Sequence, residues 1–284
     1  MKKVLQLGAH VGAAGGVYKC FENAVRIGAN TIQIFGASPR QWRATLHHEK
    51  DLLRFKEAWK QSDVVSVYLH APYLINLASP DTQLRAKSVE NLTMHLKIAE
   101  NLGANGLIFH IGSGKEMPKD QAVEIVVKQM KQVLKNAPGT SQLIIENTAG
   151  GGAKIGATPQ EIGFIMKKID SSRVKVCIDT AHLFESGLIE KYSPEEIKKF
   201  IQTWDKHVGI KNIVAFHVND SKTAFHSKHD RHENLGCGHI GLSAFQNLAK
   251  EKRLHDKAWI LEVPGFDNMG PDKKNLDILK KCFA

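Results

Sequence analysis

Six short apolar runs in the sequence each end in a residue type that binds metal ions. The residues at the ends of these runs are His70, His110, Glu146, Asp179, His217 and Glu262. Short apolar runs are typical of buried parallel strands, and polar groups at the carboxyl ends of such strands point into the mouth of an α/β barrel, where active sites lie. Imidazoles and carboxylates crowded at one mouth need cations between them, and this mixture suits Zn²⁺ or Mn²⁺. The six residues therefore predict a metal centre.

A second group of possible metal ligands follows two of these runs. Asp179 and His182 are three residues apart and would face the same way in a helical turn. Asp230 and His232 would lie on one side of an extended segment, because side chains alternate along it. From spacing alone, His182, Asp230 and His232 either hold one further metal ion of zinc type or belong to a solvated loop.

The segment before the last run is rich in glycine, with Gly236, Gly238 and Gly241 close together. Glycine lets the backbone approach a bulky ligand closely, and backbone N–H groups next to a helix start could hold a phosphate. His10 and His239 also lie near the expected mouth. Each of them could support a metal ligand or contact a phosphate.

The elements that must position these residues form eight strand–helix units. The expected strands are residues 4–9, 31–35, 64–70, 106–110, 142–146, 174–179, 213–218 and 258–263. The expected helices are one that ends at Ile27, 48–61, 81–102, 119–136, one that begins near Thr158-Pro159, 193–208, 242–251 and 272–282. Regular alternation predicts a parallel sheet, and eight units close as a (β/α)₈ TIM barrel with its active site at the C-terminal mouth of the strands. Because no linker, low-complexity tract or charge block divides the chain, we expect a single domain over residues 1–284.

Composition limits the compartment and the partners. The net charge of +10 and the pI of about 9.3 fit either an enzyme that handles a polyanion or a solvated basic surface. There is no run of about 18 apolar residues that could span a membrane, and the apolar part of the first seven residues is too short for a signal peptide. The four cysteines are scattered without a Cys-x-x-Cys motif, which favours a cytoplasmic location and argues against a thiolate zinc site.

Over its whole length the chain resembles the endonuclease IV family of abasic-site (AP) endonucleases. The motifs that carry this resemblance are Gly8-Ala-His10-Val, Arg40-Gln-Trp42, His70-Ala-Pro-Tyr73-Leu-Ile-Asn76, His110-Ile-Gly112-Ser, Glu146-Asn-Thr148-Ala-Gly150, Cys177-Ile-Asp179-Thr-x-His182, His217-Val-Asn-Asp220-Ser, Asp230-Arg-His232-Glu-Asn-Leu-Gly236 and Leu261-Glu262. The motifs are long and numerous, so the resemblance is specific.

The resemblance implies a cofactor of three Zn²⁺ ions, with Mn²⁺ able to replace zinc at some positions. It assigns the first ion to His70, His110 and Glu146, and the second to Glu146, Asp179, His217 and Glu262, with Glu146 as the bridge. It assigns the third ion to His182, Asp230 and His232. All nine positions carry matching residue types, so the resemblance favours the metal interpretation of the loop residues over the solvated one.

The resemblance also implies a reaction and a partner. The reaction is hydrolysis of the phosphodiester 5′ to an abasic site in duplex DNA, which leaves a 3′-hydroxyl and a 5′-deoxyribose phosphate. A metal-activated hydroxide would attack, with Glu146 as a catalytic residue that fixes its position. By position, Arg40, Tyr73 and Leu74 would fill the gap in the DNA stack. From the residues alone, Tyr73 could instead be core and Arg40-Gln-Trp42 an ordinary helix start. We expect a monomer.

Two rival functions stay open. A metal-dependent sugar isomerase on a similar barrel would explain the strand-end carboxylates, but it does not call for the set His182, Asp230 and His232 or for the basic charge. A non-catalytic protein that binds damaged DNA would explain the charge, but it does not call for an intact ligand set.

Overall fold

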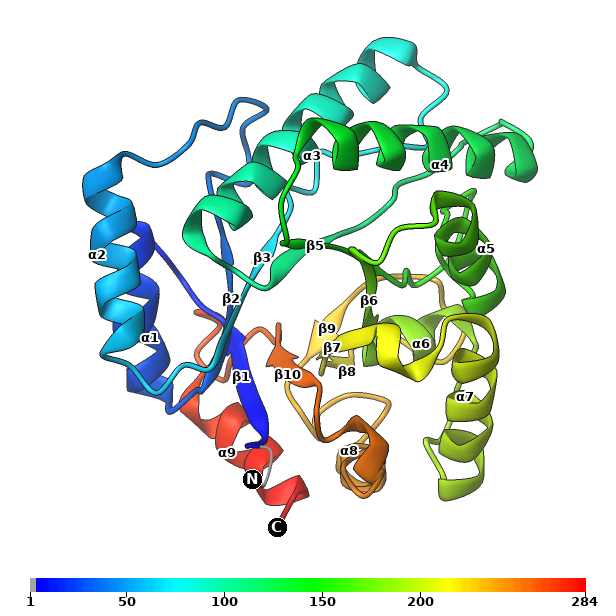
Figure 1. Cartoon of the computed structure of the whole chain (residues 1–284). Coiled ribbons are helices and arrows are strands. Elements are labelled where there is room, and N and C mark those ends of the chain that lie inside the picture. Colours follow the sequence, from blue (N-terminus) through cyan, green and yellow to red (C-terminus); the bar gives the residue numbers. More distant parts are fainter. Residues whose placement is uncertain (1–3) are drawn as a thin grey trace.

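The computed structural model, which describes residues 4–284, contains eight parallel strands that close into a barrel in the order β1-β10-β7-β6-β5-β4-β3-β2 (Figure 1). The strands are β1 (Gln6–His10), β2 (Thr31–Phe35), β3 (Ser66–His70), β4 (Gly106–Phe109), β5 (Gln142–Glu146), β6 (Val174–Asp179), β7 (Ile213–His217) and β10 (Ala258–Leu261). The predicted (β/α)₈ fold class is confirmed. Met1 to Lys3, part of the segment on which the signal-peptide expectation rests, lie outside the described residues.

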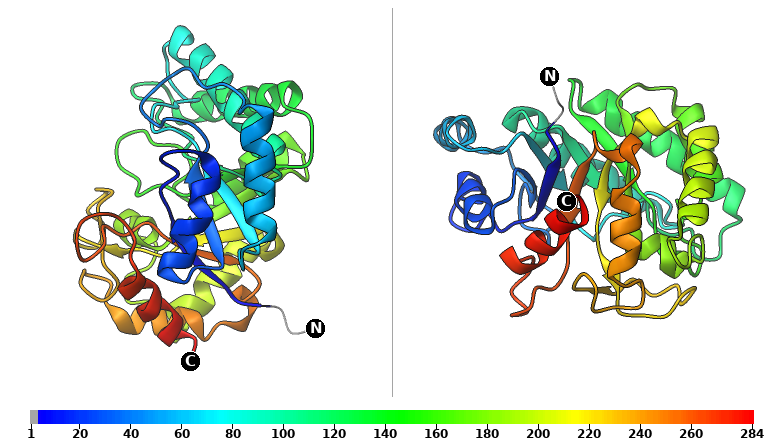
Figure 2. Two further views of the ribbon diagram at one scale, coloured as in Figure 1. Left: turned by 90° about the vertical axis from the view of Figure 1, so that its left-hand side faces the viewer. Right: turned by 90° about the horizontal axis from the view of Figure 1, so that it is seen from below.

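Helices surround the barrel on its outside (Figure 2). The main helices are α1 (Cys20–Ile27), α2 (Glu49–Lys60), α3 (Thr82–Leu102), α4 (Lys119–Asn136), α5 (Pro159–Ile169), α7 (Pro194–His207), α8 (Leu242–Ala249) and α9 (Lys273–Cys282). Three short 3-10 helices lie at Val17–Lys19, Ile210–Asn212 and Lys252–Leu254. Side-chain caps fix two helix starts: Thr158 accepts from the Glu161 N–H at the start of α5, and Ser193 accepts from the Glu196 N–H at the start of α7.

Two elements at the mouth of the barrel differ from the sequence expectation. The short helix α6 (Thr180–Ser186) directly follows β6, and a two-stranded antiparallel hairpin, β8 (Asp220–Ser221) with β9 (His232–Glu233), lies within the long loop after β7. Neither was among the expected helices and strands, although the spacing of Asp179 and His182 suggested a helical turn and that of Asp230 and His232 an extended segment. Together they bring the residues after β6 close to those after β7, and Figure 1 shows α6 beside β8 and β9.

The interior of the barrel is a packed core, and the candidate site residues form the next layer above it. The buried cluster inside the barrel consists of Tyr68, Ile108, Ile144, Cys177, Ala215, Ala258 and Ile260. Six of these seven residues stand two positions before a candidate ligand, for example Ile144 before Glu146. Because side chains alternate along a strand, each candidate ligand points inward like the core residue two positions before it. The strand pattern alone therefore directs six polar side chains to one mouth.

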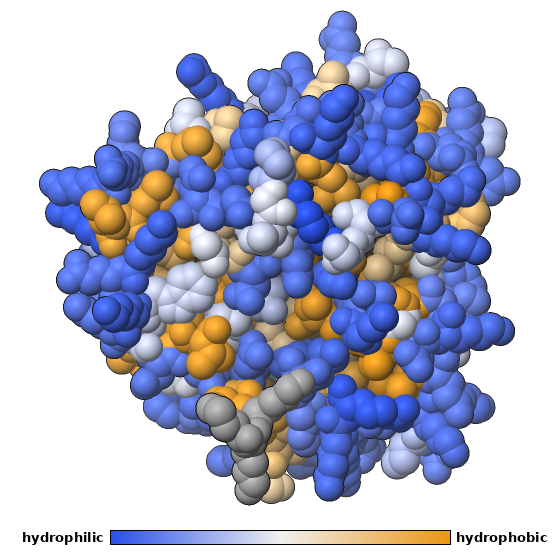
Figure 3. Space-filling view, viewed as in Figure 1, coloured by the Kyte–Doolittle hydropathy of each residue, from blue (hydrophilic) through white to orange (hydrophobic). Residues whose placement is uncertain are grey.

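The outer surface is largely hydrophilic on the face shown in Figure 3, where apolar residues form separate patches. A second and larger apolar core fills the space between the strands and the surrounding helices. No helix between residues 4 and 284 is long and apolar enough to cross a bilayer.

Candidate metal centre

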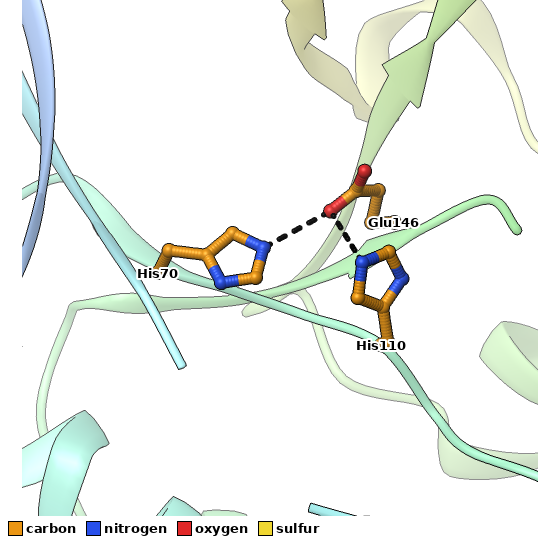
Figure 4. Close-up of side chains that lie close together, drawn as sticks. All are labelled: His70, His110 and Glu146. Atoms are coloured by element: carbon orange, nitrogen blue, oxygen red, sulfur yellow. Dashed lines mark hydrogen bonds and ion pairs between the residues drawn. The ribbon is translucent and has the colours of Figure 1, made fainter. Parts of the chain in front are cut away.

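Three predicted ligands from neighbouring strands meet around one carboxylate oxygen. Nε2 of His70 lies 3.2 Å from Oε2 of Glu146, and Nε2 of His110 lies 3.5 Å from the same oxygen (Figure 4). Nδ1 of His70 donates to the backbone carbonyl of Ala71 at 2.7 Å. In the neutral ring, Nε2 therefore turns its lone pair toward Glu146, an arrangement that is repulsive unless a proton or a cation lies between the two groups.

A second group shares Glu146 with the first. One ligand atom from each of Glu146, Asp179, His217 and Glu262 lies within 4.8 Å of the others. Nδ1 of His217 is 3.1 Å from both Oε1 of Glu146 and Oε2 of Glu262. Its other nitrogen, Nε2, is 2.8 Å from the Oε1 acceptor of the buried Gln33, which directs the Nδ1 lone pair toward the two carboxylates.

The third group is built on α6 and the hairpin. Asp179 caps α6 by accepting from the His182 N–H at 2.8 Å, so the two residues face the same way as their spacing predicted. Nε2 of His182 lies 3.1 Å from Oδ2 of Asp230, and Nε2 of His232 lies 3.5 Å from Oδ1 of Asp230. Nδ1 of His182 donates to the carbonyl of Asn147 at 2.8 Å.

The site fits cations because its polar atoms lack other partners. Within residues 4–284, four buried atoms of the nine-residue set have no hydrogen-bond partner: Oε1 of Glu146, Nε2 of His182, Nδ1 of His217 and Nε2 of His232. Each of these imidazoles is held by its other nitrogen against a carbonyl or amide oxygen. A histidine fixed on one side, with a free lone pair facing carboxylates on the other, has the arrangement of a metal ligand.

Electrostatics support the same conclusion. Burial alone would raise the pKa of the Glu146 carboxyl, but the His110 and His217 imidazoles beside it hold that pKa well below its usual value. Burial alone would lower the pKa of His182, but Asp179 and Asp230 raise it well above its usual value. The buried carboxylates therefore require positive charge next to them, which divalent cations can supply in place of protons.

The metal centre lies in a cavity of about 910 Å³ whose wall includes Tyr73 on the loop after β3. Tyr73 is 73% exposed, so the interpretation of this residue as core is wrong. Its ring stands 5.9 Å from the ring of His70, centroid to centroid. Leu74 beside it is half-buried, and Arg40 is exposed in a turn of the β2–α2 connection, of which Pro39 lines the cavity. Since α2 begins only at Glu49, the interpretation of Arg40-Gln-Trp42 as a helix start is also wrong.

The suggested phosphate site in the glycine-rich loop is wrong, because its N–H groups already have an acceptor. The carboxylate of Asp220, which is fully buried, accepts from the N–H groups of Gly236, Gly238, Ile240 and Gly241 at 2.9–3.4 Å. The same carboxylate accepts from the Ser221 N–H at 2.8 Å. The loop is therefore folded around a side chain of the protein, and no N–H in this set is left to hold a phosphate.

The two histidines expected near the mouth lie in different places. His10 lines the cavity, where Nδ1 is 2.9 Å from the Gln33 amide and 3.5 Å from Oε1 of Glu262. His239 is exposed and lines a separate groove with Phe225 and Glu190. His10 can therefore position a metal ligand, whereas His239 does not reach the centre.

Several residues that shape the centre were missed by the sequence analysis. Gln33, Asn147 and Asp220 each hold a candidate ligand or the loop next to one. Glu185 on α6 also has a ligand atom within 4.8 Å of His182 and Asp230. Two of them carried a signal: Gln33 is a polar residue inside the apolar run Thr-Ile-Gln-Ile-Phe, and Glu185 follows His182 at helical spacing.

Known proteins similar to this chain agree with the fold. A family model described as a xylose isomerase-like TIM barrel matches residues 21–282. A probable endonuclease 4 of Halothermothrix orenii is 32% identical over 278 residues, 98% of this chain and 100% of the relative. A probable endonuclease 4 of Campylobacter concisus is 37% identical over 261 residues, 90% of this chain and 92% of the relative.

Solved structures extend the comparison. The endonuclease IV of Thermus thermophilus superposes with a TM-score of 0.85 and 31% identity, covering 97% of each chain. A D-tagatose 3-epimerase-like protein reaches a TM-score of 0.71 at 17% identity over 98% of this chain and 97% of its own, which shows the shared fold alone. With full-length relatives above 30% identity and the same barrel, the chain belongs to the endonuclease IV family.

Proposed function

We propose that this protein is a DNA-repair AP endonuclease that hydrolyses the phosphodiester 5′ to an abasic site in duplex DNA and leaves a 3′-hydroxyl and a 5′-deoxyribose phosphate. The observation that carries the proposal is the convergence at one barrel mouth of nine side chains of types that can bind metal ions, with four buried atoms that have no partner among the described residues. Family membership supplies the substrate class, since the similar proteins are named endonucleases.

We assign three zinc positions to the nine residues. His70, His110 and Glu146 would hold the first ion, and Glu146 with Asp179, His217 and Glu262 would hold the second. His182, Asp230 and His232 would hold the third, with Asp179 close to two of them. Glu146 belongs to the first two groups, which supports its role as a bridge. When bound, such ions acidify water and neutralise charge on the phosphate oxygens.

The side chains of the protein would orient both the ions and the DNA. Glu146 is fully buried, so its carboxylate is fixed between the imidazoles around it. Tyr73 projects at the rim of the cavity, where its ring can replace the stacking that a missing base would provide. Leu74 beside it and Arg40 on the neighbouring loop are the other two candidates for this gap. The net charge of +10 would supply salt-dependent contacts to the DNA backbone.

The sugar isomerase interpretation is less well supported. The D-tagatose 3-epimerase-like protein shares only the fold with this chain, at 17% sequence identity. The isomerase interpretation also does not account for the third group of ligands or for the basic net charge.

A nicking assay on a synthetic duplex with one abasic site tests the proposal. The metal-loaded protein should cut 5′ to the site and leave an end that a DNA polymerase extends, and a chelator should abolish cutting. Glu146→Gln should lower the cutting rate by more than about 100-fold, since it removes a ligand charge shared by two ions. Glu190→Gln makes the same charge change at an exposed position and is the matched control.

Three results would reject the proposal. These are near-normal cutting by Glu146→Gln, cutting by the wild type that a chelator does not affect, and tight binding of abasic DNA by the metal-loaded protein without any cutting.

A further inference from the structure

Glu185 is a buried carboxylate at the third group of ligands that the nine-residue assignment leaves out. It lies on α6, three residues after His182, and its side chain is completely buried. One ligand atom from each of His182, Glu185 and Asp230 lies within 4.8 Å of the others. A carboxylate in such surroundings needs both hydrogen-bond donors and positive charge.

The two oxygens of Glu185 have different surroundings. Oε1 lies near three donors of the loop after β7: Ser221 Oγ at 2.8 Å, the Arg231 N–H at 3.2 Å and Thr223 Oγ1 at 3.3 Å. Oε1 therefore ties this loop, which carries Asp230, to α6. Oε2 is buried and has no hydrogen-bond partner among residues 4–284.

A second buried atom that offers a lone pair and has no hydrogen-bond partner among the described residues lies near Glu185. Nε2 of His182 is also buried and has only the carboxylate of Asp230, at 3.1 Å, facing it within the described part of the chain. A hydrogen-bond acceptor without a donor and an imidazole lone pair facing a carboxylate are stabilised together by a single cation placed between them.

We propose that Glu185 is a further ligand of the third metal position, with Oε2 directed at the cation held by His182 and Asp230. This inference rests on the proposed function, because it assumes that a third ion is present. The side chain then acts in two ways, since Oε1 fixes the loop and Oε2 adds a negative charge at the ion. The added carboxylate makes the position richer in oxygen ligands and so more tolerant of Mn²⁺ than the first position, which has two imidazoles and one carboxylate.

The test is metal binding by the whole protein without DNA. Glu185→Gln keeps an oxygen that can accept from Ser221, Thr223 and Arg231 but removes the charge. Wild type and variant are equilibrated in buffers of fixed free Zn²⁺, and the bound zinc is measured by inductively coupled plasma mass spectrometry. The variant should bind one of its three ions about 10- to 100-fold more weakly and keep the other two unchanged. Glu190→Gln, an equal charge change on an exposed residue after the same helix, should bind all three ions like the wild type.

A second variant separates a ligand from a loop clamp. The double substitution Ser221→Ala with Thr223→Val removes two donors to Oε1 and leaves the Glu185 carboxylate in place. The double variant should lose less affinity for the third ion than Glu185→Gln does. An equal or larger loss would show that Glu185 only clamps the loop, and the proposal would be wrong.

Two further outcomes for Glu185→Gln would also overturn the proposal. Wild-type zinc affinity in Glu185→Gln overturns the proposal. Loss of all three ions also overturns it, because the proposal expects the first two ions to stay bound at an intact barrel mouth. Failure of the proposed function gives a different result, since the wild type itself would then bind no zinc or leave abasic DNA uncut.

Discussion

His95 lies in α3 with no exposed surface, and neither of its ring nitrogens has a hydrogen-bond partner within residues 4–284. Burial lowers the pKa of its imidazole from the usual 6.5 to about 4, and the nearby His70 adds to this shift. The folded protein therefore holds His95 neutral at pH values where the unfolded chain would protonate it. Acid should destabilise the protein through this one residue.

The sign and the size follow from proton linkage. The pKa of His95 is lower in the folded protein, so the unfolded chain binds more protons. The neutral His95 therefore makes its full contribution to the free energy of unfolding only above about pH 6.5. It is lost as the pH falls from there toward about 4. With these two pKa values, the free energy of unfolding should drop by about 2 kcal/mol between roughly pH 7.5 and pH 5. Below pH 4 the total loss of free energy of unfolding from this residue reaches about 3 kcal/mol, because each unit of pKa difference corresponds to about 1.4 kcal/mol.

The assay compares wild type with His95→Leu by urea denaturation at both pH values. Both proteins are stripped of metal, so that protonation of the metal ligands contributes equally and cancels in the difference. Leucine removes the titrating group and leaves no unpaired polar atom in its place. The variant should therefore gain about 2 kcal/mol relative to the wild type on going to about pH 5. The same difference at both pH values would refute the reasoning, as would an NMR titration that gives His95 a pKa near 6.5 in the folded protein.

Three other substitutions test how the centre is held. Asp220→Asn should lower the free energy of unfolding by about 2–4 kcal/mol, because it removes the charge that the loop N–H groups share, and unchanged stability in urea would contradict that role. Gln33→Leu frees Nε2 of His217 and should weaken one zinc ion about 10- to 100-fold in chelator competition; unchanged affinity would show that Gln33 does not orient His217. Tyr73→Ala should reduce affinity for an abasic duplex about 10-fold or more, and affinity for an intact duplex much less, by fluorescence anisotropy. Equal losses on both duplexes would reject the stacking role.

The barrel could be predicted because each strand carries its own signal. The expected bounds of β2, β5 and β6 agree with the structure to the residue. A continuous apolar run followed by a polar residue reports both a strand and its carboxyl end, and the alternation of side chains then fixes which way that residue points. The prediction that His70, Glu146 and their counterparts meet at one mouth needed no knowledge of long-range contacts.

The elements above the mouth could not be predicted in the same way. α6 has only seven residues, and its N-cap is Asp179, a residue that the sequence pattern assigns to the end of a strand. The strands β8 and β9 have two residues each, which is too short for any alternation to show. Their pairing joins Ser221 to His232 across the loop. Such elements exist because of their tertiary contacts rather than their local sequence.

The phosphate prediction was wrong for a related reason. The sequence shows the N–H donors of Gly236, Gly238 and Gly241, but it does not show their acceptor, which is the carboxylate of Asp220, 16 to 21 residues away. Gln33 presents the same difficulty, since its partners His217 and Glu262 are 184 and 229 residues away. A polar residue inside an apolar strand signals that a partner exists but does not identify it.

These differences divide the centre into two parts with different mechanical support. The first two groups of ligands stand at or next to the ends of paired strands, directly above the packed interior of the barrel. The third group has His182 on a short helix, and Asp230 and His232 on a loop, and the Asp230 side chain is 44% exposed. Segments held by few buried contacts open at lower free energy than core strands. The buried contacts of Asp220 and of Glu185 Oε1 therefore matter most for the third group, because they tie this loop to the rest of the molecule.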